Sequence, residues 1–146
     1  ILYKILELIK NNNTKIIVFI PPIANTTYKK MEGYQYGFVD TFRDLINSLN
    51  VENYDYHDSS VITKNDCEYV DGFHGGDVVY SRILKNIYDN NSSISKYIEI
   101  GNINNSVNLY QGNALIVNSG NIFKNQEVDF LKLGCKKKHR NKLTPP

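Results

Sequence analysis

The stretch Lys15-Ile16-Ile17-Val18-Phe19-Ile20-Pro21-Pro22 decides the fold of this chain. Its continuous run of β-branched and aromatic residues predicts a strand buried on both faces, as in parallel sheets that are covered by helices. The two prolines end the strand, because neither can donate a backbone hydrogen bond to a neighbouring strand and Pro22 holds its predecessor extended.

Amphipathic patterns predict a helix on each side of this strand. Apolar residues at helical spacing over residues 2–9 predict a short helix, which the asparagine cluster at 11–13 ends. After the strand, residues 28–49 carry apolar side chains three or four positions apart, which predicts one long helix that Gly33 and Gly37 weaken locally. The apolar stripe of that helix consists of Met31, Tyr34, Phe38, Phe42, Leu45 and Leu49.

The pattern continues with a second strand and a third helix. Residues 51–56 predict the strand, and residues 57–60 a polar loop at its carboxyl end. Residues 77–88 predict an amphipathic helix with Asp77 as its N-cap. This order of elements indicates an α/β layered fold, in which ligands bind outside the carboxyl ends of the strands.

The C-terminal third has a different character. Residues 97–100, 107–110 and 114–117 predict short strands that are separated by glycine and asparagine. We therefore expect residues 1–91 to belong to the α/β domain and residues 92–135 to form a β-containing extension, packed on that domain or partly ordered. The basic segment 136–146 is expected to be a flexible tail.

The loop Asp71-Gly72-Phe73-His74 carries the residues best suited to chemistry. An aspartate on a tight loop can accept the Nδ1–H of the following histidine and leave its Nε2 free as a general base. Asp71 and His74 are therefore the candidate catalytic residues. The alternative is that both are structural, with His74 a loop histidine bonded to backbone groups.

Three other positions allow two interpretations each. Asn25 can contact a substrate at the rim of the site, although helix capping together with its neighbouring threonines is favoured. The pair His57-Asp58 can be a second acid–base or metal pair, but two ligands do not close a metal site. The pair Gly75-Gly76 most simply allows the loop to turn into the next helix, because no Lys-Ser/Thr follows for a phosphate loop.

Composition limits the function classes. With 146 residues and a net charge of +2, the chain fits one domain. Six of its 17 basic residues crowd near the C-terminus and form no amphipathic face, so nucleic-acid binding is not expected. No run approaches the roughly 20 apolar residues of a membrane span. Cys67 and Cys135 match no metal-ligand spacing, and the sequence leaves open whether they form a disulfide. Because the chain begins at Ile1, we expect a downstream piece or processed product, from which a targeting segment would be lost.

The segment 15–87 resembles the C-terminal half of the SGNH (GDSL-like) hydrolase superfamily, and most closely its cell-envelope branch with DltD-type and alginate-acetylation-type proteins. The similarity rests on the strand ending in Pro21-Pro22, the helix and strand that follow, and the Asp-x-x-His loop with glycines before the last helix. It implies a three-layer α/β/α sandwich with a parallel sheet. It also implies that Asp71 and His74 complete a Ser-His-Asp triad acting on esters, often acyl groups on carbohydrates, without a metal or organic cofactor.

The chain lacks the nucleophile block of that superfamily. Ser59, Ser60 and Ser119 do not follow the Gly-Asp pattern that the family has at its serine. We therefore expect this chain to be the C-terminal part of a serine esterase or O-acyltransferase of the cell envelope, with an ester such as an acylated carbohydrate as substrate. Its partner is then the N-terminal part of the same protein, and any membrane association lies in a segment outside this chain. The alternative is a non-catalytic α/β binding or assembly domain.

Overall fold

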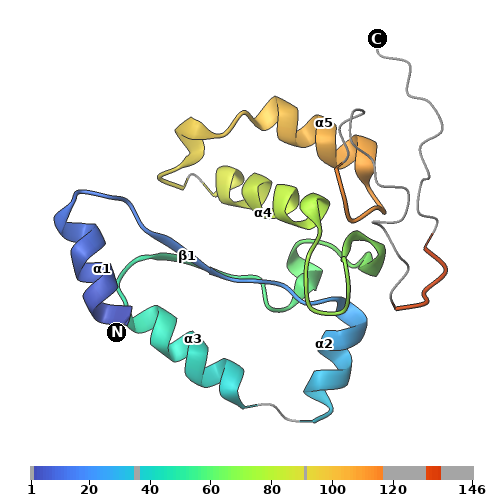
Figure 1. Cartoon of the computed structure of the whole chain (residues 1–146), viewed down its shortest axis with the longest axis horizontal. Helices are drawn as coiled ribbons and strands as arrows, with labels where there is room; N and C mark the ends of the chain where they lie inside the picture. The colour runs from blue at the N-terminus through green and yellow to red at the C-terminus, as the bar shows by residue number, and fades with distance from the viewer. Residues whose placement is uncertain (1, 35–36, 91, 117–130, 136–146) are drawn as a thin grey trace.

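Two short parallel strands form the sheet of this protein. The computed structural model describes residues 2–34, 37–90, 92–116 and 131–135. Strand β1 (Ile17–Ile20) pairs with β2 (Glu52–Asp55) in a register that runs from Ile17 opposite Glu52 to Ile20 opposite Asp55. Both predicted strands are therefore present, and their pairing is parallel as expected (Figure 1).

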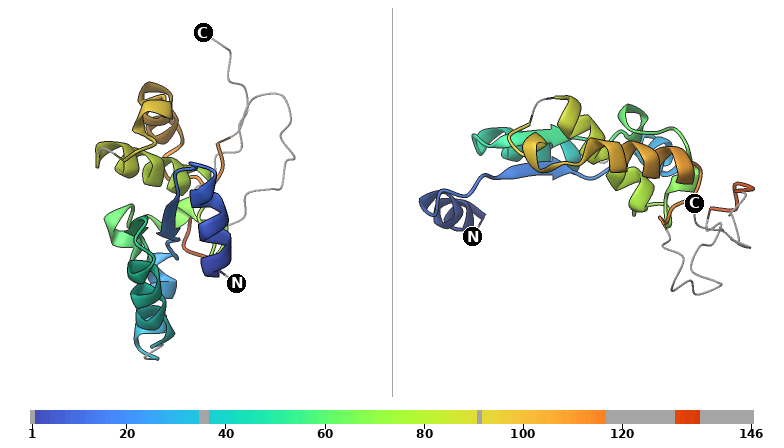
Figure 2. Two further views of the ribbon diagram at one scale, coloured as in Figure 1. Left: turned by 90° about the vertical axis from the view of Figure 1, so that its left-hand side faces the viewer. Right: turned by 90° about the horizontal axis from the view of Figure 1, so that it is seen from above.

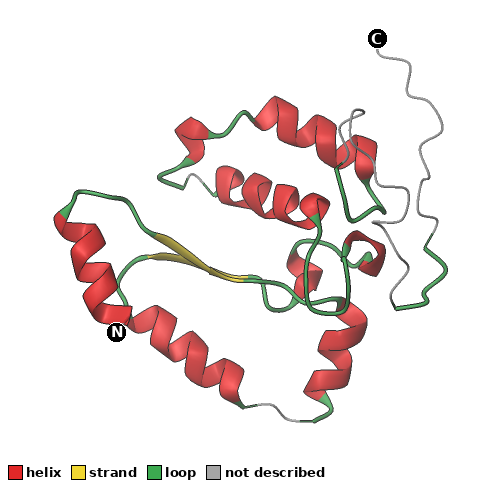
Figure 3. Ribbon diagram, viewed as in Figure 1, coloured by secondary structure: helices red, strands yellow, loops and turns green. Residues whose placement is uncertain are grey.

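Helices make up most of the remaining described structure, as the colouring in Figure 3 shows. The α-helices are α1 (Leu2–Asn11), α2 (Asn25–Glu32), α3 (Phe38–Ser48), α4 (Asp77–Asp89) and α5 (Ile100–Tyr110). Three short 3-10 helices are η1 (Ser59–Val61), η2 (Asp66–Glu68) and η3 (Ser95–Tyr97). Together these elements give a mixed α/β fold with a small parallel sheet.

The strands are covered on both faces by apolar side chains from helices. Buried Val79, Ile83 and Ile87 of α4 form one cluster with Tyr56, and Tyr54 packs against it. A second cluster combines Leu6 of α1 with Ile46 of α3 and with Leu49, which directly follows α3. Val18 of β1 packs against this cluster. Because consecutive strand residues point to opposite faces, α4 lies on one face of the sheet and α1 and α3 on the other.

The single long helix predicted over residues 28–49 is wrong. The chain forms α2, which ends at Glu32, and α3, which begins at Phe38. Gly33 and Gly37 flank the break, and each costs a helix interior about 1 kcal/mol relative to alanine. The predicted apolar stripe also fails at this point, because Tyr34 is 76% exposed.

The predicted β-containing extension is also corrected. Residues 107–110 lie within α5, and residues 97–100 contain the end of η3 and the first residue of α5. Helix α5 packs along α4 (Figure 2). The spacing of Ile100, Ile103 and Val107 fits one helix face, but the many asparagines are poor helix formers, so packing on α4 decides the outcome. Residues 114–116 form no strand, whereas Val117 and the predicted tail 136–146 lie outside the described residues.

The start of α4 differs from the prediction by one residue. Gly76 occupies the N-cap position and Asp77 is the first helical residue. The Asp77 carboxylate instead accepts a hydrogen bond from the Ile116 amide at 3.0 Å, and the Val78 amide donates to the Ala114 carbonyl at 3.3 Å. The segment after α5 thus serves as a cap for α4. Within the described part of the chain, no helix is long and apolar enough to cross a membrane.

Candidate functional site

A tight loop carries the candidate catalytic residues. Its two arms are joined by hydrogen bonds from the Val70 amide to the His74 carbonyl at 2.9 Å and from the Gly76 amide to the Glu68 carbonyl at 3.0 Å. An antiparallel bridge also joins the ends of residues 69–75, which we call the dyad loop. Because these bonds close the base of the dyad loop, its tip has little conformational freedom.

The Asp71 carboxylate organises the interior of the dyad loop. Its Oδ1 accepts hydrogen bonds from the amides of Phe73 at 2.7 Å and His74 at 2.8 Å. Its Oδ2 lies 2.8 Å from Nδ1 of the His74 ring. Partial burial raises the pKa of Asp71, but the hydrogen bonds from His74 and Phe73 outweigh this effect and lower the pKa below its ordinary value. Asp71 is therefore held as a carboxylate.

The His74 ring has the orientation that general base chemistry requires. A carboxylate only accepts hydrogen bonds, so the neutral ring carries its proton on Nδ1, toward Asp71, and keeps a lone pair on Nε2. The His74 side chain is 75% exposed, whereas that of Asp71 is 28% exposed. Asp71 thus lies below the ring, and His74 is accessible to another group at the surface. The contact expected from the sequence is present.

The dyad loop is attached to the start of α2. The Gly72 carbonyl accepts a hydrogen bond from the Ala24 amide at 3.1 Å. The next two amides, of Asn25 and Thr26, donate to the two carboxylate oxygens of Asp66 at 2.6 and 2.8 Å. Asp66 therefore caps α2, and the interpretation that Asn25 caps this helix is wrong, because Asn25 is already its first helical residue. A contact of Asn25 with substrate stays a prediction.

The pair His57-Asp58 has local structural contacts. The half-buried His57 ring lies edge-on to Tyr28, with ring centroids 5.7 Å apart. Burial and the positive charge of Arg43 lower the pKa of His57. Asp58 caps η1 by accepting a hydrogen bond from the Ser60 amide at 2.9 Å. No group of three or more potential metal ligands occurs among the residues that the structure describes.

The three serines considered as nucleophiles, Ser59, Ser60 and Ser119, differ in their accessibility and in whether the structure describes them. Ser59 is completely buried, so its hydroxyl does not reach a substrate at the surface. Ser60 is exposed and its amide is bonded to Asp58. Ser119 lies outside the described residues.

The two glycines after His74 are explained by close packing. A Cβ atom on Gly76 would lie 2.2 Å from the Ala114 carbonyl oxygen, and one on Gly75 would lie 2.8 Å from Cγ1 of Val79. Gly76 has a φ of −83°, which any residue adopts, so the requirement for glycine there is one of space. This agrees with the backbone interpretation of the pair.

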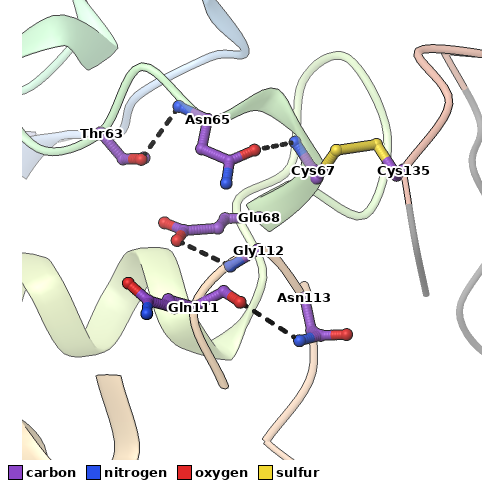
Figure 4. The surroundings of a disulfide bond; sticks show 8 residues. All are labelled: Thr63, Asn65, Cys67, Glu68, Gln111, Gly112, Asn113 and Cys135. Atoms are coloured by element: carbon purple, nitrogen blue, oxygen red, sulfur yellow. Dashed lines mark hydrogen bonds between the residues drawn. A yellow bond between two sulfur atoms is a disulfide. The ribbon is translucent and has the colours of Figure 1, made fainter. Parts of the chain in front are cut away.

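A disulfide bond joins Cys67 to Cys135, with Cα atoms 5.5 Å apart (Figure 4). It anchors residues 131–135 beside the dyad loop. Leu131 packs against the apolar cluster of α4, and its Cδ2 would lie 3.5 Å from a Cβ on Gly72. The sequence left this pairing open, because two cysteines 68 residues apart say nothing about their distance in space.

An ion pair with a buried carboxylate at the base of the dyad loop was not foreseen. Arg82 of α4 donates two hydrogen bonds at 2.8 Å to the carboxylate of Glu68, whose side chain is 1% exposed. The Gly112 amide adds a third hydrogen bond at 3.1 Å, drawn in Figure 4. One sequence feature pointed to this pair: Arg82 follows buried Val78 by four positions, so a charge falls on the apolar face of α4 and needs a partner.

Comparisons of the chain with protein-family models, with curated proteins and with solved structures found no match.

Proposed function

We propose that this chain is the C-terminal portion of an SGNH-type serine ester hydrolase or carbohydrate O-acyltransferase and supplies the Asp-His half of its triad. The observation that carries the proposal is the 2.8 Å contact between Asp71 Oδ2 and His74 Nδ1 on a closed loop, with the His74 ring exposed. This is the arrangement that positions an imidazole to activate a serine.

In the proposed mechanism His74 acts as a proton carrier. Its Nε2 takes the proton of a serine hydroxyl while the serine oxygen attacks the ester carbonyl, and then returns that proton to the departing alcohol. The acyl group stays on the serine until water, or the hydroxyl of an acceptor, attacks with the same assistance. Asp71 keeps the ring in the Nδ1–H tautomer and stabilises the positive charge that forms on it.

The edge of β1 that is unpaired among the described residues supports the proposal that an N-terminal part of the same protein adds a further strand to the sheet. Among the described residues, β1 pairs only with β2. Ile20 accepts from the Tyr56 amide, so the alternate residues Ile17 and Phe19 direct their backbone groups to the other edge. Phe19 is 37% exposed, although its strand has the composition of one buried on both faces. A strand added at this edge would extend the fold toward the proposed three-layer sandwich.

The disulfide between Cys67 and Cys135 favours an extracytoplasmic location, because such bonds persist in oxidising compartments. An acylated carbohydrate is the proposed substrate class, in line with the cell-envelope proteins that the chain resembles. The proposed reaction requires no metal or organic cofactor.

Ester hydrolysis by the complete protein, followed with a chromogenic acetyl ester, tests the proposal. We expect His74→Ala to lose nearly all turnover and Asp71→Asn to lose about 10⁴-fold, because asparagine favours the wrong tautomer. His57→Ala is the control, since it removes a different histidine, one that is half-buried and away from Asp71, and should keep the activity. Undiminished hydrolysis by His74→Ala would reject the catalytic role.

A non-catalytic binding or assembly domain is the second candidate. It is favoured by the complete burial of Ser59, which leaves the described residues with no serine that follows an aspartate and is accessible. A serine-directed fluorophosphonate probe separates the candidates. The complete protein should be labelled if it is a serine hydrolase and should stay unlabelled if it is a binding domain.

A further inference from the structure

The ion pair between the buried carboxylate of Glu68 and the partly buried side chain of Arg82 links the two ends of the dyad loop. Glu68 directly precedes the loop, and Arg82 lies in α4, which begins after the single intervening residue Gly76. The side-chain contact therefore joins the two ends of the segment 68–82 independently of the backbone bonds. His74 belongs to this closed segment. Any change in the spacing of the two arms would therefore move the imidazole of His74.

The geometry of the pair is more restrictive than a simple charge contact. Nε and Nη2 of Arg82 donate to separate oxygens of the Glu68 carboxylate, both at 2.8 Å, so the planar guanidinium fixes the orientation of α4 relative to the loop. The Gly112 amide, which follows α5, binds the same carboxylate at 3.1 Å. Three segments of the chain thus meet at one side chain.

Stability alone does not account for such a pair. Removing the Glu68 carboxylate and part of the Arg82 side chain from water is costly, and well-packed apolar residues of similar volume commonly stabilise a protein as well or better. A bidentate pair whose carboxylate is buried does, however, select one arrangement of the elements that it joins. Side chains that perform chemistry need this kind of support, because small displacements of the ring destroy the productive geometry.

We propose that Glu68 and Arg82 are positioning residues that hold the His74 ring against Asp71. This inference rests on the proposed function for its catalytic meaning, but the orientation of the ring can be measured without any activity. The tip of the loop has its own anchor, the bond from Ala24 to Gly72. The ion pair supports the base of the loop, where the arms enter and leave.

The test replaces both charges at once. In Glu68→Met/Arg82→Leu, no charge is left unpaired in the interior, so we expect the chain to fold and to melt at or above the temperature of the unsubstituted chain. Long-range ¹H–¹⁵N correlation spectra, recorded at mildly alkaline pH, report which ring nitrogen of His74 carries the proton. The His74 signals are assigned by comparison with His74→Gln.

We expect the ring signals of His74 to shift from the Nδ1–H tautomer toward a mixture with the Nε2–H tautomer. In the complete protein, kcat should fall while KM changes little. The matched control is Lys85→Ala/Asp89→Ala, which removes an exposed ion pair from the same helix and should leave the His74 signals unchanged. A folded double variant with the original tautomer would overturn the positioning role.

A second variant covers the case in which the double variant does not fold. Arg82→Lys keeps the positive charge but loses the planar fork, so it should fold and show a smaller shift in the same direction. An unchanged tautomer in folded Arg82→Lys would also overturn the proposal. Activity that survives His74→Ala would reject the proposed function. It would not reject the positioning role of Glu68 and Arg82, since the tautomer is read from the imidazole of His74 itself.

Discussion

The Gly72 carbonyl oxygen accepts the Ala24 amide at 3.1 Å, which joins the tip of the dyad loop to the first turn of α2. The two segments are 48 residues apart in the sequence and carry no charge at this contact. The loop that positions His74 therefore depends on the start of α2 as well as on its own hydrogen bonds. Substitutions at this contact should affect stability and the candidate site together.

Gly72→Ala should destabilise the chain, and a second substitution should restore it. The new Cβ would lie 2.6 Å from Oγ1 of Thr27, and such overpacking costs about 1–3 kcal/mol. Thr27→Ala removes that oxygen, so the double variant should recover most of the loss. Urea denaturation of the four proteins gives the coupling. Equal losses with and without Thr27→Ala would show that the close contact is not the cause.

Gly76→Ala should be worse than Gly72→Ala, because the obstacle is backbone. Its Cβ would lie 2.2 Å from the Ala114 carbonyl oxygen, which cannot rotate away. We expect a loss of at least about 3 kcal/mol, or failure to fold. Gly101→Ala in α5 is the control: nothing lies within 4 Å of its Cβ, and alanine favours a helix, so stability should be unchanged or slightly higher. Similar behaviour of the two variants would contradict the packing at Gly76.

Reduction of the disulfide should destabilise the chain by about 2–4 kcal/mol, because the bond closes a long segment and restricts the unfolded state. The urea midpoint of the oxidised chain should fall when dithiothreitol is added. Cys67→Ser/Cys135→Ser should already have the lower midpoint and should not respond to the reductant. A midpoint that is independent of redox conditions in all samples would exclude a stabilising disulfide.

Tyr56 predicts a loss of stability at alkaline pH. Burial raises its pKa from 10.0 to about 12, and its hydroxyl donates to Oδ1 of Asn86 at 2.9 Å. Between these two values the folded chain keeps a proton that the unfolded chain releases. The free energy of unfolding should therefore fall as the pH rises through this window, by at most about 1.4 kcal/mol for each pH unit from this group.

The measurement is the free energy of unfolding in urea at several pH values from about 9 to about 12, a range that includes both the ordinary and the raised pKa of Tyr56. Tyr56→Phe should be less stable at neutral pH, since it removes one hydrogen bond, but its stability should fall less steeply across the window. The same slope in both proteins would show that Tyr56 does not contribute to the alkaline transition.

The local patterns of the sequence predicted β1, β2, α1 and α4, because in these segments the apolar period and the turn residues agree. The division between α2 and α3 was missed, since the apolar stripe continued across two glycines that favour a break. Helix α5 was missed because β-branched residues between asparagines resemble short strands, whereas its packing on α4 depends on distant residues.

In the candidate site, too, the sequence predicted the local contact but not the contacts between different segments. Asp71 and His74 are three positions apart on a tight loop, so the sequence was sufficient to predict their contact. The cap that Asp66 provides for α2 joins residues 41 positions apart, and the pairing of Glu68 with Arg82 spans 14 positions across the dyad loop. No local pattern identifies such partners, although a charge on an apolar helix face indicates that one exists.

The bond between Cys67 and Cys135 also determines how the chain responds to proteolysis. Cleavage of any peptide bond between these two cysteines leaves two polypeptides that remain covalently joined. Such a product migrates on a denaturing gel as one species until a reductant separates it into two. Because Leu131 packs beside Gly72, a cleaved chain would keep this side chain in position next to the dyad loop.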